Sequence, residues 1–571
     1  MIWLRAVALA IALATVGQAA NTCTDTATGN WSAAGTWTSC GGTIPQPGDT
    51  VQISGGHTVT LDTDTNVASI LINLINSKLV TNGVAHTVTM TIAASNCLTL
   101  RNKATLDTSA ATAGNEVTFT CPNMTGTSQA VIAGQFASPF QGLETLKLYH
   151  AILIPSGGGD GIFVSNAFGS FTVDVRYCKQ TGGTRFFSST SALPNATFIG
   201  NTFDGLAGNA IAPQNGDATS WTVTDNTDIN SATQGTLLKF PGNNSGGTFS
   251  RNAAFGTGVA RTVYKGNNGS TTTATTISYN IGSTTSIGAD PMLGYCAGAS
   301  TAHCSYDHNV GELYFTGIHT NNSYIDLSYN IMTGNTLTGP GQGCYITLTG
   351  SHITSLSDVC MLDSNNGNIG WLFIGGGSDL VQQNGLYYMS TADSGSSFAI
   401  SAGEGGGGAN AFLLASVSNT IMLNKTYGIG ANNASDTFVT TGTGSVGVFN
   451  NLSTGASSSD YYNPSSIASF GTSHPSATYG DVQLAPGVIS VTRRLAQCDA
   501  IAFGGPGTTA HLFGDLAKRW NSTNTAAITP AAIWNCMAAP LSAQNTALAT
   551  LGYGSTFVGP YKPKVIAAVV P

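Results

Sequence analysis

The sequence predicts an all-β protein, a right-handed parallel β-helix with three short strands in each coil and a small helical cap at the C-terminal end. A short strand that ends in asparagine recurs every 23–28 residues over more than 150 positions. The segments between these strands are rich in Gly, Asn, Ser and Thr, which form turns. Hydrophobic residues make up 42% of the chain and occur in short regular runs, which argues against disorder.

The recurring strands define a ladder of asparagines. Copies end at Asn201, Asn226, Asn252, Asn280 and Asn330, and Cys178 occupies the same position one interval before Asn201. The interval of 50 residues before Asn330 corresponds to two coils. Asparagine tolerates the left-handed bend between strands, and stacked asparagines can hydrogen-bond their side-chain amides along the coil axis. A β-sandwich also has closely spaced strands, but it does not predict asparagine at this interval.

The first 20 residues have the features of a cleavable secretory signal. Arg5 provides the positive charge, residues 6–16 form a short apolar segment, and small residues follow at Gly17 and Ala19. Elsewhere the chain has no stretch long and apolar enough to predict a membrane span. We therefore expect a secreted, extracellular protein.

The cysteines fit export. Eleven cysteines favour disulfides with one thiol left over, and Cys178, which should point inward, is the expected thiol. Zinc is the alternative, but the sequence has no Cys-x-x-Cys pair. Connectivity does not follow from sequence, so pairing of neighbours is a hypothesis. It gives Cys23–Cys40, Cys97–Cys121, Cys296–Cys304, Cys344–Cys360 and Cys498–Cys536.

The N-terminal part contains Trp31 and Trp37, followed by the segments 43–53, 57–62 and 68–72. Together these resemble the G8-type opening of secreted pectate-lyase-like β-helix proteins. The resemblance implies a fold whose members include polysaccharide-depolymerising enzymes and adhesins, and it does not imply a particular reaction.

Four parts are expected along the chain. They are a signal peptide at 1–20, G8-like first coils at 21–75, the β-helix at 76–480, and a helical cap at 481–571 stapled by Cys498–Cys536. Solenoids need capped ends, so a structural role is the favoured interpretation of the last part, and a binding module is the alternative.

One motif resembles polygalacturonase-type hydrolases. Asn226-Thr227-Asp228 matches their Asn-Thr-Asp, but the paired Asp, Gly-His-Gly and Arg-Ile-Lys that accompany it in that family are absent. Because Asn226 is already explained by the ladder, we do not assign the motif a catalytic role.

A second candidate is a cluster of cations. Arg176, Lys179 and Arg185 lie close together in a chain with only 19 Lys and Arg residues. We expect Arg176 on a strand, with Tyr177 on its opposite face, and the other two in the following loop. A polysaccharide lyase needs a cation to neutralise the uronate carboxylate, so these residues are candidates for substrate binding. The alternative is a solvated turn.

The third candidate is the densest group of titratable residues. His303, Asp307, His308 and Glu312 fall within ten positions, and His319 follows. We expect a loop that leaves the coil between Asn280 and Asn330, with Asp307 and His308 as acid and base. A metal site and a disulfide-clipped polar loop are the alternatives. No cofactor is expected; calcium at a turn containing Asp160 has no supporting series of ligands.

Two classes of function remain open. The first is a carbohydrate-active protein, a polysaccharide lyase or glycoside hydrolase, that binds extracellular polysaccharide along one flank. The second is a non-catalytic surface, adhesive or structural protein. The net charge of −8 gives no electrostatic footprint for nucleic acid.

Overall fold

The fold was analysed in a computed structural model. The described residues are 21–40, 43–93, 95–126, 128–135, 145–165, 171–190, 193, 195–213, 218–229, 236–239, 244–255, 262–265, 274–283, 293–294, 299–312, 315–318, 324–334, 345–347, 352–356, 358–362, 372–374, 378–383, 386–389, 398–402, 412–418, 420–423, 427–431, 437–441, 446–449, 467–470 and 478–480. The predicted signal peptide and the predicted helical cap lie outside them.

The described chain is an all-β parallel solenoid in which successive strands of a coil join three parallel sheets, as predicted. It contains no α-helix within the described residues; one 3-10 turn, η1, covers Ala34–Thr36. The chain divides into two compact units, Met1–Asp174 and Val175–Pro571, each described by itself below.

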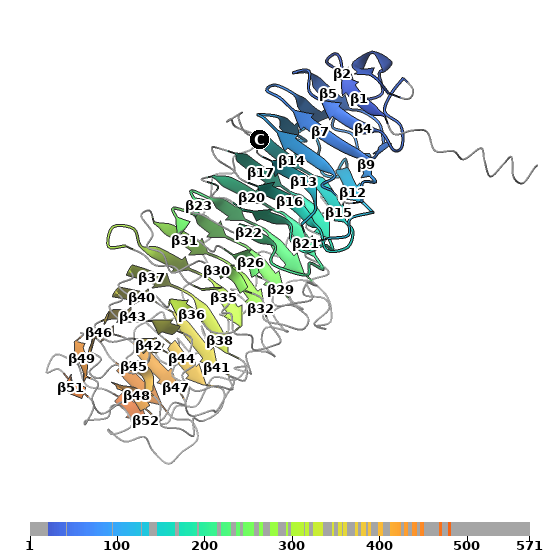
Figure 1. Ribbon diagram of the computed structural model, residues 1–571. Helices are drawn as coiled ribbons and strands as arrows, with labels where there is room; N and C mark the ends of the chain where they lie inside the picture. Colours follow the sequence, from blue (N-terminus) through green and yellow to red (C-terminus); the bar gives the residue numbers. More distant parts are fainter. Residues whose placement is uncertain are drawn as a thin grey trace, which may run out of the picture. The chain divides into compact units, whose positions relative to one another are not determined.

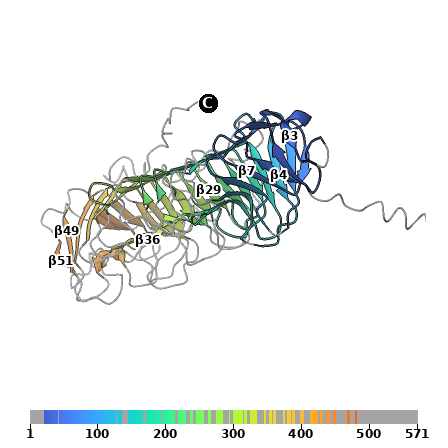
Figure 2. The ribbon, with the colours of Figure 1, turned by 45° about the horizontal axis from the view of Figure 1, so that its top comes forward.

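In the first unit, parallel strands follow one another from coil to coil (Figures 1 and 2). One sheet has the order β3 (Trp37–Thr38), β1 (Thr22–Asp25), β4 (Thr50–Ile53), β7 (Ser69–Asn73), β10 (Leu98–Arg101), β13 (Ala130–Gln135) and β16 (Asp160–Ser165). Its first strand, β3, is antiparallel to β1. The second has β2 (Gly29–Asn30), β5 (Thr58–Leu61), β8 (Lys78–Thr81), β11 (Thr105–Asp107) and β14 (Thr145–Tyr149). The third has β6 (Thr65–Val67), β9 (His86–Met90), β12 (Val117–Cys121) and β15 (Ala151–Pro155).

The core of the first unit consists of aliphatic side chains stacked from coil to coil. Val51, Ile70, Leu98, Ile132 and Ile162 occupy one register row and are all buried. Each coil adds a layer of apolar side chains that only its neighbours cover, so no coil is stable alone.

Two predicted disulfides are confirmed in this unit, Cys23–Cys40 and Cys97–Cys121. Cys304, in the second unit, is disulfide-bonded, but its expected partner Cys296 lies outside the described residues. The other two predicted pairs involve Cys344, Cys498 and Cys536, which also lie outside the description, and Cys360, whose side chain is not described.

The second unit repeats the arrangement from β17 (Thr172–Arg176), which crosses the division between the units, onward. One sheet has β19 (Phe187–Ser189), β22 (Ile211–Pro213), β26 (Thr236–Lys239), β30 (Thr262–Lys265) and β33 (Leu293–Gly294). Another has β18 (Lys179–Thr181), β21 (Thr202–Asp204), β25 (Thr227–Ile229), β29 (Ala253–Phe255), β32 (Ile281–Ser283), β35 (Val310–Glu312), β38 (Ile331–Gly334), β41 (Val359–Leu362), β44 (Leu386–Met389), β47 (Thr420–Leu423), β50 (Val446–Phe449) and β52 (Thr478–Gly480). Two smaller sheets contain β36 (Phe315–Ile318), β39 (Tyr345–Thr347), β42 (Leu372–Ile374), β45 (Phe398–Ala402) and β48 (Tyr427–Ala431), and β23 (Ala218–Thr219) with β27 (Asn244–Ser245).

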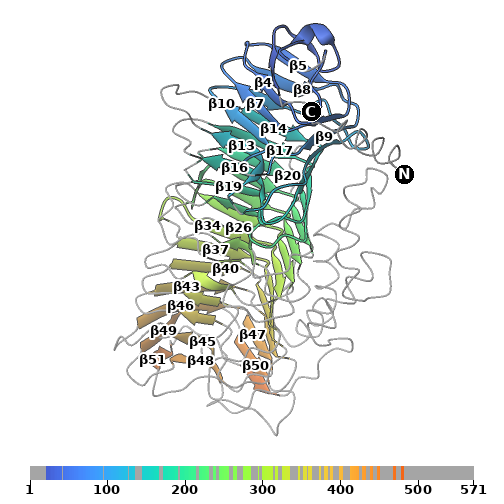
Figure 3. The same ribbon diagram turned by 45° about the vertical axis from the view of Figure 1, so that its right-hand side comes forward.

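The remaining sheet of the second unit, here called the ladder sheet, precedes the asparagines. Its successive parallel strands can be followed in Figure 3. They are β20 (Ala196–Ile199), β24 (Thr222–Thr224), β28 (Thr248–Ser250), β31 (Thr275–Ser278), β34 (Cys304–Asp307), β37 (Tyr324–Ser328), β40 (His352–Leu356), β43 (Ser378–Gln383), β46 (Phe412–Ser418), β49 (Thr437–Thr441) and β51 (Ile467–Phe470).

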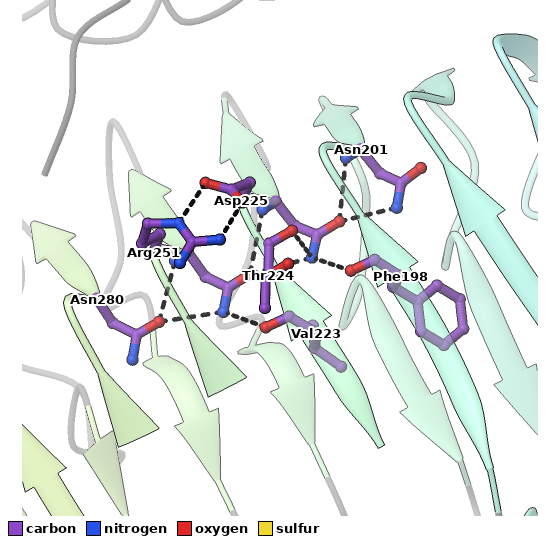
Figure 4. Close-up of polar contacts among 9 residues, drawn as sticks. Phe198, Asn201, Val223, Thr224, Asp225, Arg251 and Asn280 are labelled. Carbon is purple, nitrogen blue, oxygen red and sulfur yellow. Dashed lines mark hydrogen bonds and ion pairs between the residues drawn. The ribbon is translucent and has the colours of Figure 1, made fainter. Parts of the chain in front are cut away.

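The predicted asparagine ladder is present along the end of this sheet (Figure 4). Asn226 shows the pattern: its main-chain N–H and its Nδ2 both donate to Oδ1 of Asn252, at 3.1 and 3.0 Å. Its Nδ2 also donates to the main-chain carbonyl of Phe198 in the preceding coil, at 2.9 Å. The same bonds recur at every rung, and each rung is at most 1% exposed: Asn201, Asn226, Asn252, Asn280, Asn309 and Asn330.

Cys178 begins the ladder as predicted from its position in the repeat. Its main-chain N–H donates to Oδ1 of Asn201 at 2.9 Å, and its side chain is fully buried. It is a thiol rather than part of a disulfide, which agrees with the prediction. A thiol at this position has no amide to donate, so the rungs start at Asn201.

Two details of the ladder differ from expectation. The interval of 50 residues before Asn330 contains two coils, as predicted. The rung Asn309 divides it into coils of 29 and 21 residues, outside the expected range of 23–28. The left-handed residue at each bend is not the asparagine but the residue before it. These residues have φ between 53° and 66°: Tyr177, Gly200, Asp225, Arg251, Tyr279, His308 and Tyr329.

The ladder gives a direct stability prediction. Replacing Asn252 by alanine removes the side-chain partners of two buried groups, the main-chain N–H of Asn226 and the carbonyl of Val223. Nδ2 of Asn226 loses one acceptor and keeps the carbonyls of Phe198 and Thr224. Each buried group left without its partner costs about 1–3 kcal/mol, so we expect a loss of about 3 kcal/mol or more in unfolding free energy, measured by urea unfolding. Thr248→Ala, at a half-buried position on β28, is the matched control and should change it by less than about 0.5 kcal/mol. Equal losses for both variants would contradict the account.

Candidate functional site

The third sequence candidate lies on the ladder sheet and not in a loop. Residues 304–307 form β34, and the buried, disulfide-bonded Cys304 points into the core in register with Thr275 and Ile325. The expected loop is therefore wrong at residues 304–309, which form a strand of the ladder sheet, a bend at His308 and the rung Asn309. Asp307 and His308 thus share a sheet face with residues of the next coils.

One row of rings crosses this face at the start of the strands. His303 stacks on Tyr324 with ring centroids 5.4 Å apart, and Tyr324 stacks on His352 at 4.2 Å. The carboxylate of Asp326 lies 2.9 Å from Nδ1 of His303, and both side chains are about two-fifths exposed. This outer row therefore presents imidazole, phenol and carboxylate groups to solvent.

A second row of rings follows the bend next to the rungs. His308 is stacked between Tyr279 and Tyr329, with centroid distances of 4.9 and 4.8 Å. These separations match the spacing of neighbouring strands, about 4.8 Å, because each ring leaves the left-handed residue of its own coil. Since the ring faces cover one another, this bend row offers mainly ring edges to a ligand.

The predicted acid and base form one dyad. Nδ1 of His308 lies 2.7 Å from Oδ1 of Asp307, and the Ser328 hydroxyl donates to the same oxygen at 2.8 Å. A carboxylate held on Nδ1 leaves Nε2 as the proton-exchanging atom of the imidazole. The two groups bind each other, so the arrangement suits one acid–base centre and not two opposed groups. Its catalytic role stays a prediction, and the His308 side chain is only 8% exposed.

The remaining members of this candidate are separated from the dyad. Glu312 ends β35, which belongs to the sheet after the rung, and its side chain is not described. His319 lies outside the described residues. The structure therefore brings together His303 and Asp326 in one contact and Asp307 and His308 in another.

The cation cluster is divided by a corner of the coil. Arg176 ends β17, the left-handed Tyr177 and the rung position Cys178 turn the chain, and Lys179 begins β18 in the neighbouring sheet. The expected placement of Lys179 in a loop and of Tyr177 on the strand is therefore wrong. Arg185 lies beyond β18, where its carbonyl accepts a bond from Gln180. Substrate binding by these residues stays a prediction.

The polygalacturonase-like motif is buried. Asn226 and Asp228 are fully buried and Thr227 is 2% exposed, so none of the three can contact a polysaccharide on the surface of this structure. This agrees with the structural interpretation of Asn226. Asp160 is not at a turn as expected, because it is the buried first residue of β16.

Neither a metal-binding cluster nor a membrane-spanning helix occurs in the described part of the chain. No group of three or more His, Cys, Asp and Glu side chains is arranged to hold a metal ion there. The same residues include no helical segment with the length and hydrophobicity that crossing a bilayer requires.

Sequence reasoning missed most of the face. Tyr324 and His352 follow His303 at intervals of 21 and 28 residues, the same intervals that separate Asn309, Asn330 and Asp358. Applying the ladder spacing to every position of the repeat would have placed these rings in one row.

A second group that sequence reasoning missed lies in the first unit. The buried Asp25 accepts hydrogen bonds from the N–H groups of Ser54 and Gly55 and contacts the imidazole Nδ1 of His57, and so holds the turn before His57.

No protein-family model, curated protein or solved structure matches the chain. The G8-like resemblance of the N-terminal part therefore stays a prediction from the sequence.

The bend row predicts different roles for two histidines. His308→Ala removes two stacked ring contacts and the imidazole partner of Asp307, so we expect a loss of about 2 kcal/mol in unfolding free energy. His303→Ala, at a partly exposed position of the outer row, should cost less than about 1 kcal/mol. Thermal unfolding of both variants checks this, and a larger loss for His303→Ala would refute the assignment of His308 to the packed row.

Proposed function

We propose that this chain is an exported protein that binds an extended extracellular polysaccharide along the outer face of β31, β34, β37 and β40. The observation that carries the proposal is the outer row formed by His303, Tyr324 and His352. Its groups repeat along the coil axis, as the hydroxyl groups of a linear glycan repeat along its chain.

The chemistry of the face suits a sugar polymer. Imidazole, phenol and carboxylate groups donate and accept hydrogen bonds. Because Tyr324 is stacked between His303 and His352, it offers its ring edge and hydroxyl group to a sugar. The carboxylate of Asp326, beside His303, adds an acceptor within the outer row. A repeating surface of this kind supports binding of several successive residues of one chain.

The charge of this region favours a neutral glycan over a uronate. Residues 266–424 contain no Lys or Arg. Lyase chemistry on a uronate requires a cation beside the substrate carboxylate. If the Asp307–His308 dyad is catalytic, hydrolysis of a neutral glycan therefore fits this face better than β-elimination.

A non-catalytic adhesive or structural role is the second candidate. It is supported by the packing of His308 between two tyrosines, which gives the dyad a structural function of its own. An adhesive protein would share polysaccharide contact through the outer row with the first candidate and differ in that no bond is cleaved. A purely structural protein would bind no glycan.

A panel of neutral and anionic polysaccharides tests the proposal. We expect affinity electrophoresis to show retention by at least one neutral glycan, and assays of reducing ends and of unsaturated products to reveal any cleavage. Tyr324→Ala should weaken binding about tenfold, the equivalent of ~1.4 kcal/mol. Tyr177→Ala removes a 46% exposed tyrosine at a bend several coils away and should leave affinity unchanged.

Two outcomes would reject the proposal. Failure of every glycan to bind would favour a purely structural protein. Binding that Tyr324→Ala leaves intact would remove the outer row from the site.

A further inference from the structure

Among the described residues, the last rung of the ladder is an acid. Asp358 occupies the seventh rung, where its Oδ1 accepts the main-chain N–H and Nδ2 of Asn330 at 2.8 and 2.9 Å. These are the bonds that Oδ1 of each preceding asparagine accepts. Asp358 is only 2% exposed, so a carboxyl group occupies a buried position that is an asparagine amide at the preceding rungs.

The second oxygen of Asp358 has a different task from the amide nitrogen that it replaces. At the two preceding rungs, Nδ2 donates to a carbonyl of the preceding coil, from Asn309 to Ile277 and from Asn330 to Tyr306, at 2.9 and 3.0 Å. An ionised carboxylate has no proton to donate, whereas a neutral carboxyl group has one. Oδ2 of Asp358 accepts a bond from the Ser355 hydroxyl at 2.5 Å.

The surroundings of Asp358 disfavour the ionised form. Burial raises the pKa of Asp358 to about 6, and the nearby Asp307 carboxylate on β34 also raises it. The bonds from Ser355 and Asn330 act in the opposite direction. The Asp307 carboxylate is the charged group that acts on Asp358, and the imidazole of His308 contacts that carboxylate in turn.

We propose that Asp358 is a proton-binding site that makes the end of the ladder sensitive to pH. In mildly acidic solution the neutral carboxyl group closes the ladder as an amide would. Near neutral pH the carboxylate is buried without full compensation, and the coil that contains β40 is destabilised. His352 of the outer row lies on β40. Protonation of Asp358 therefore also changes the stability of the coil that carries part of the outer row.

The direction of the effect follows from the raised pKa. The neutral form is favoured by folding, so its stabilising contribution is complete below the ordinary pKa of 3.8 and is lost as the pH rises through about 6. A difference of about two pKa units corresponds to a change of roughly 100-fold in the folding equilibrium constant.

The test compares the wild type with Asp358→Asn from pH 4 to pH 7 by urea unfolding. An asparagine keeps the Oδ1 acceptor, adds a donor and has no charge. We expect the variant to gain up to roughly 100-fold in folding equilibrium constant over the wild type at pH 7, and little at pH 4. Thr248→Ala, which changes no titratable group, is the control and should show the same pH dependence as the wild type.

A second variant keeps the test decisive if Asp358→Asn folds poorly. Ser355→Ala removes the hydroxyl group that stabilises the carboxylate of Asp358. Its unfolding free energy should therefore fall more between pH 4 and pH 7 than that of the wild type. The proposal is overturned if Asp358→Asn retains the full pH dependence of the wild type, or if Ser355→Ala flattens it.

Discussion

A coil that passes from one parallel sheet to the next must bend its backbone, and the main-chain N–H after the bend then lies in the buried interior. In the second unit that N–H belongs to the rung residue, and Oδ1 of the next rung accepts it. The rung's Nδ2 shares the same acceptor and also donates backward to a carbonyl. Every rung thus depends on both neighbouring coils, and a buried polar network is stabilising only when all its members are satisfied. This constraint fixes the register of the ladder sheet.

The surface of the ladder sheet follows from that register. Each left-handed residue precedes a rung, so its side chain meets the equivalent side chain of the next coil. Asp225 and Arg251 form a bidentate ion pair this way, with distances of 2.9 and 2.6 Å, and the bend row stacks its rings. At Gly200 a Cβ would lie 2.6 Å from the Tyr177 ring, so glycine leaves room for that tyrosine. The bend row is therefore a consequence of how the corners are built.

The fold and most of the rungs could be predicted from the sequence. Replacing a buried rung asparagine would leave main-chain groups without hydrogen-bond partners, so asparagine recurs once in each coil. The sequence was insufficient at Asn309, where coils of 29 and 21 residues hide the period, and this led to the wrong expectation of a loop around His303 and Asp307. Proximity in sequence also misled at Arg176 and Lys179, since a corner separates them. The outer row follows the same intervals as the rungs, so it could be predicted only once Asn309 was recognised as a rung.

Hydrogen exchange of the native protein tests the central claim most directly, because it reports the opening of individual main-chain N–H groups. If the ladder holds the coils together, the N–H groups of Asn226, Asn252 and Asn280 should be among the slowest to exchange and should open together. The N–H of Gly182, which bonds to Asp204 at a turn away from the rungs, should exchange much faster. Rung N–H groups that exchange as fast as Gly182, or independently of one another, would contradict the account.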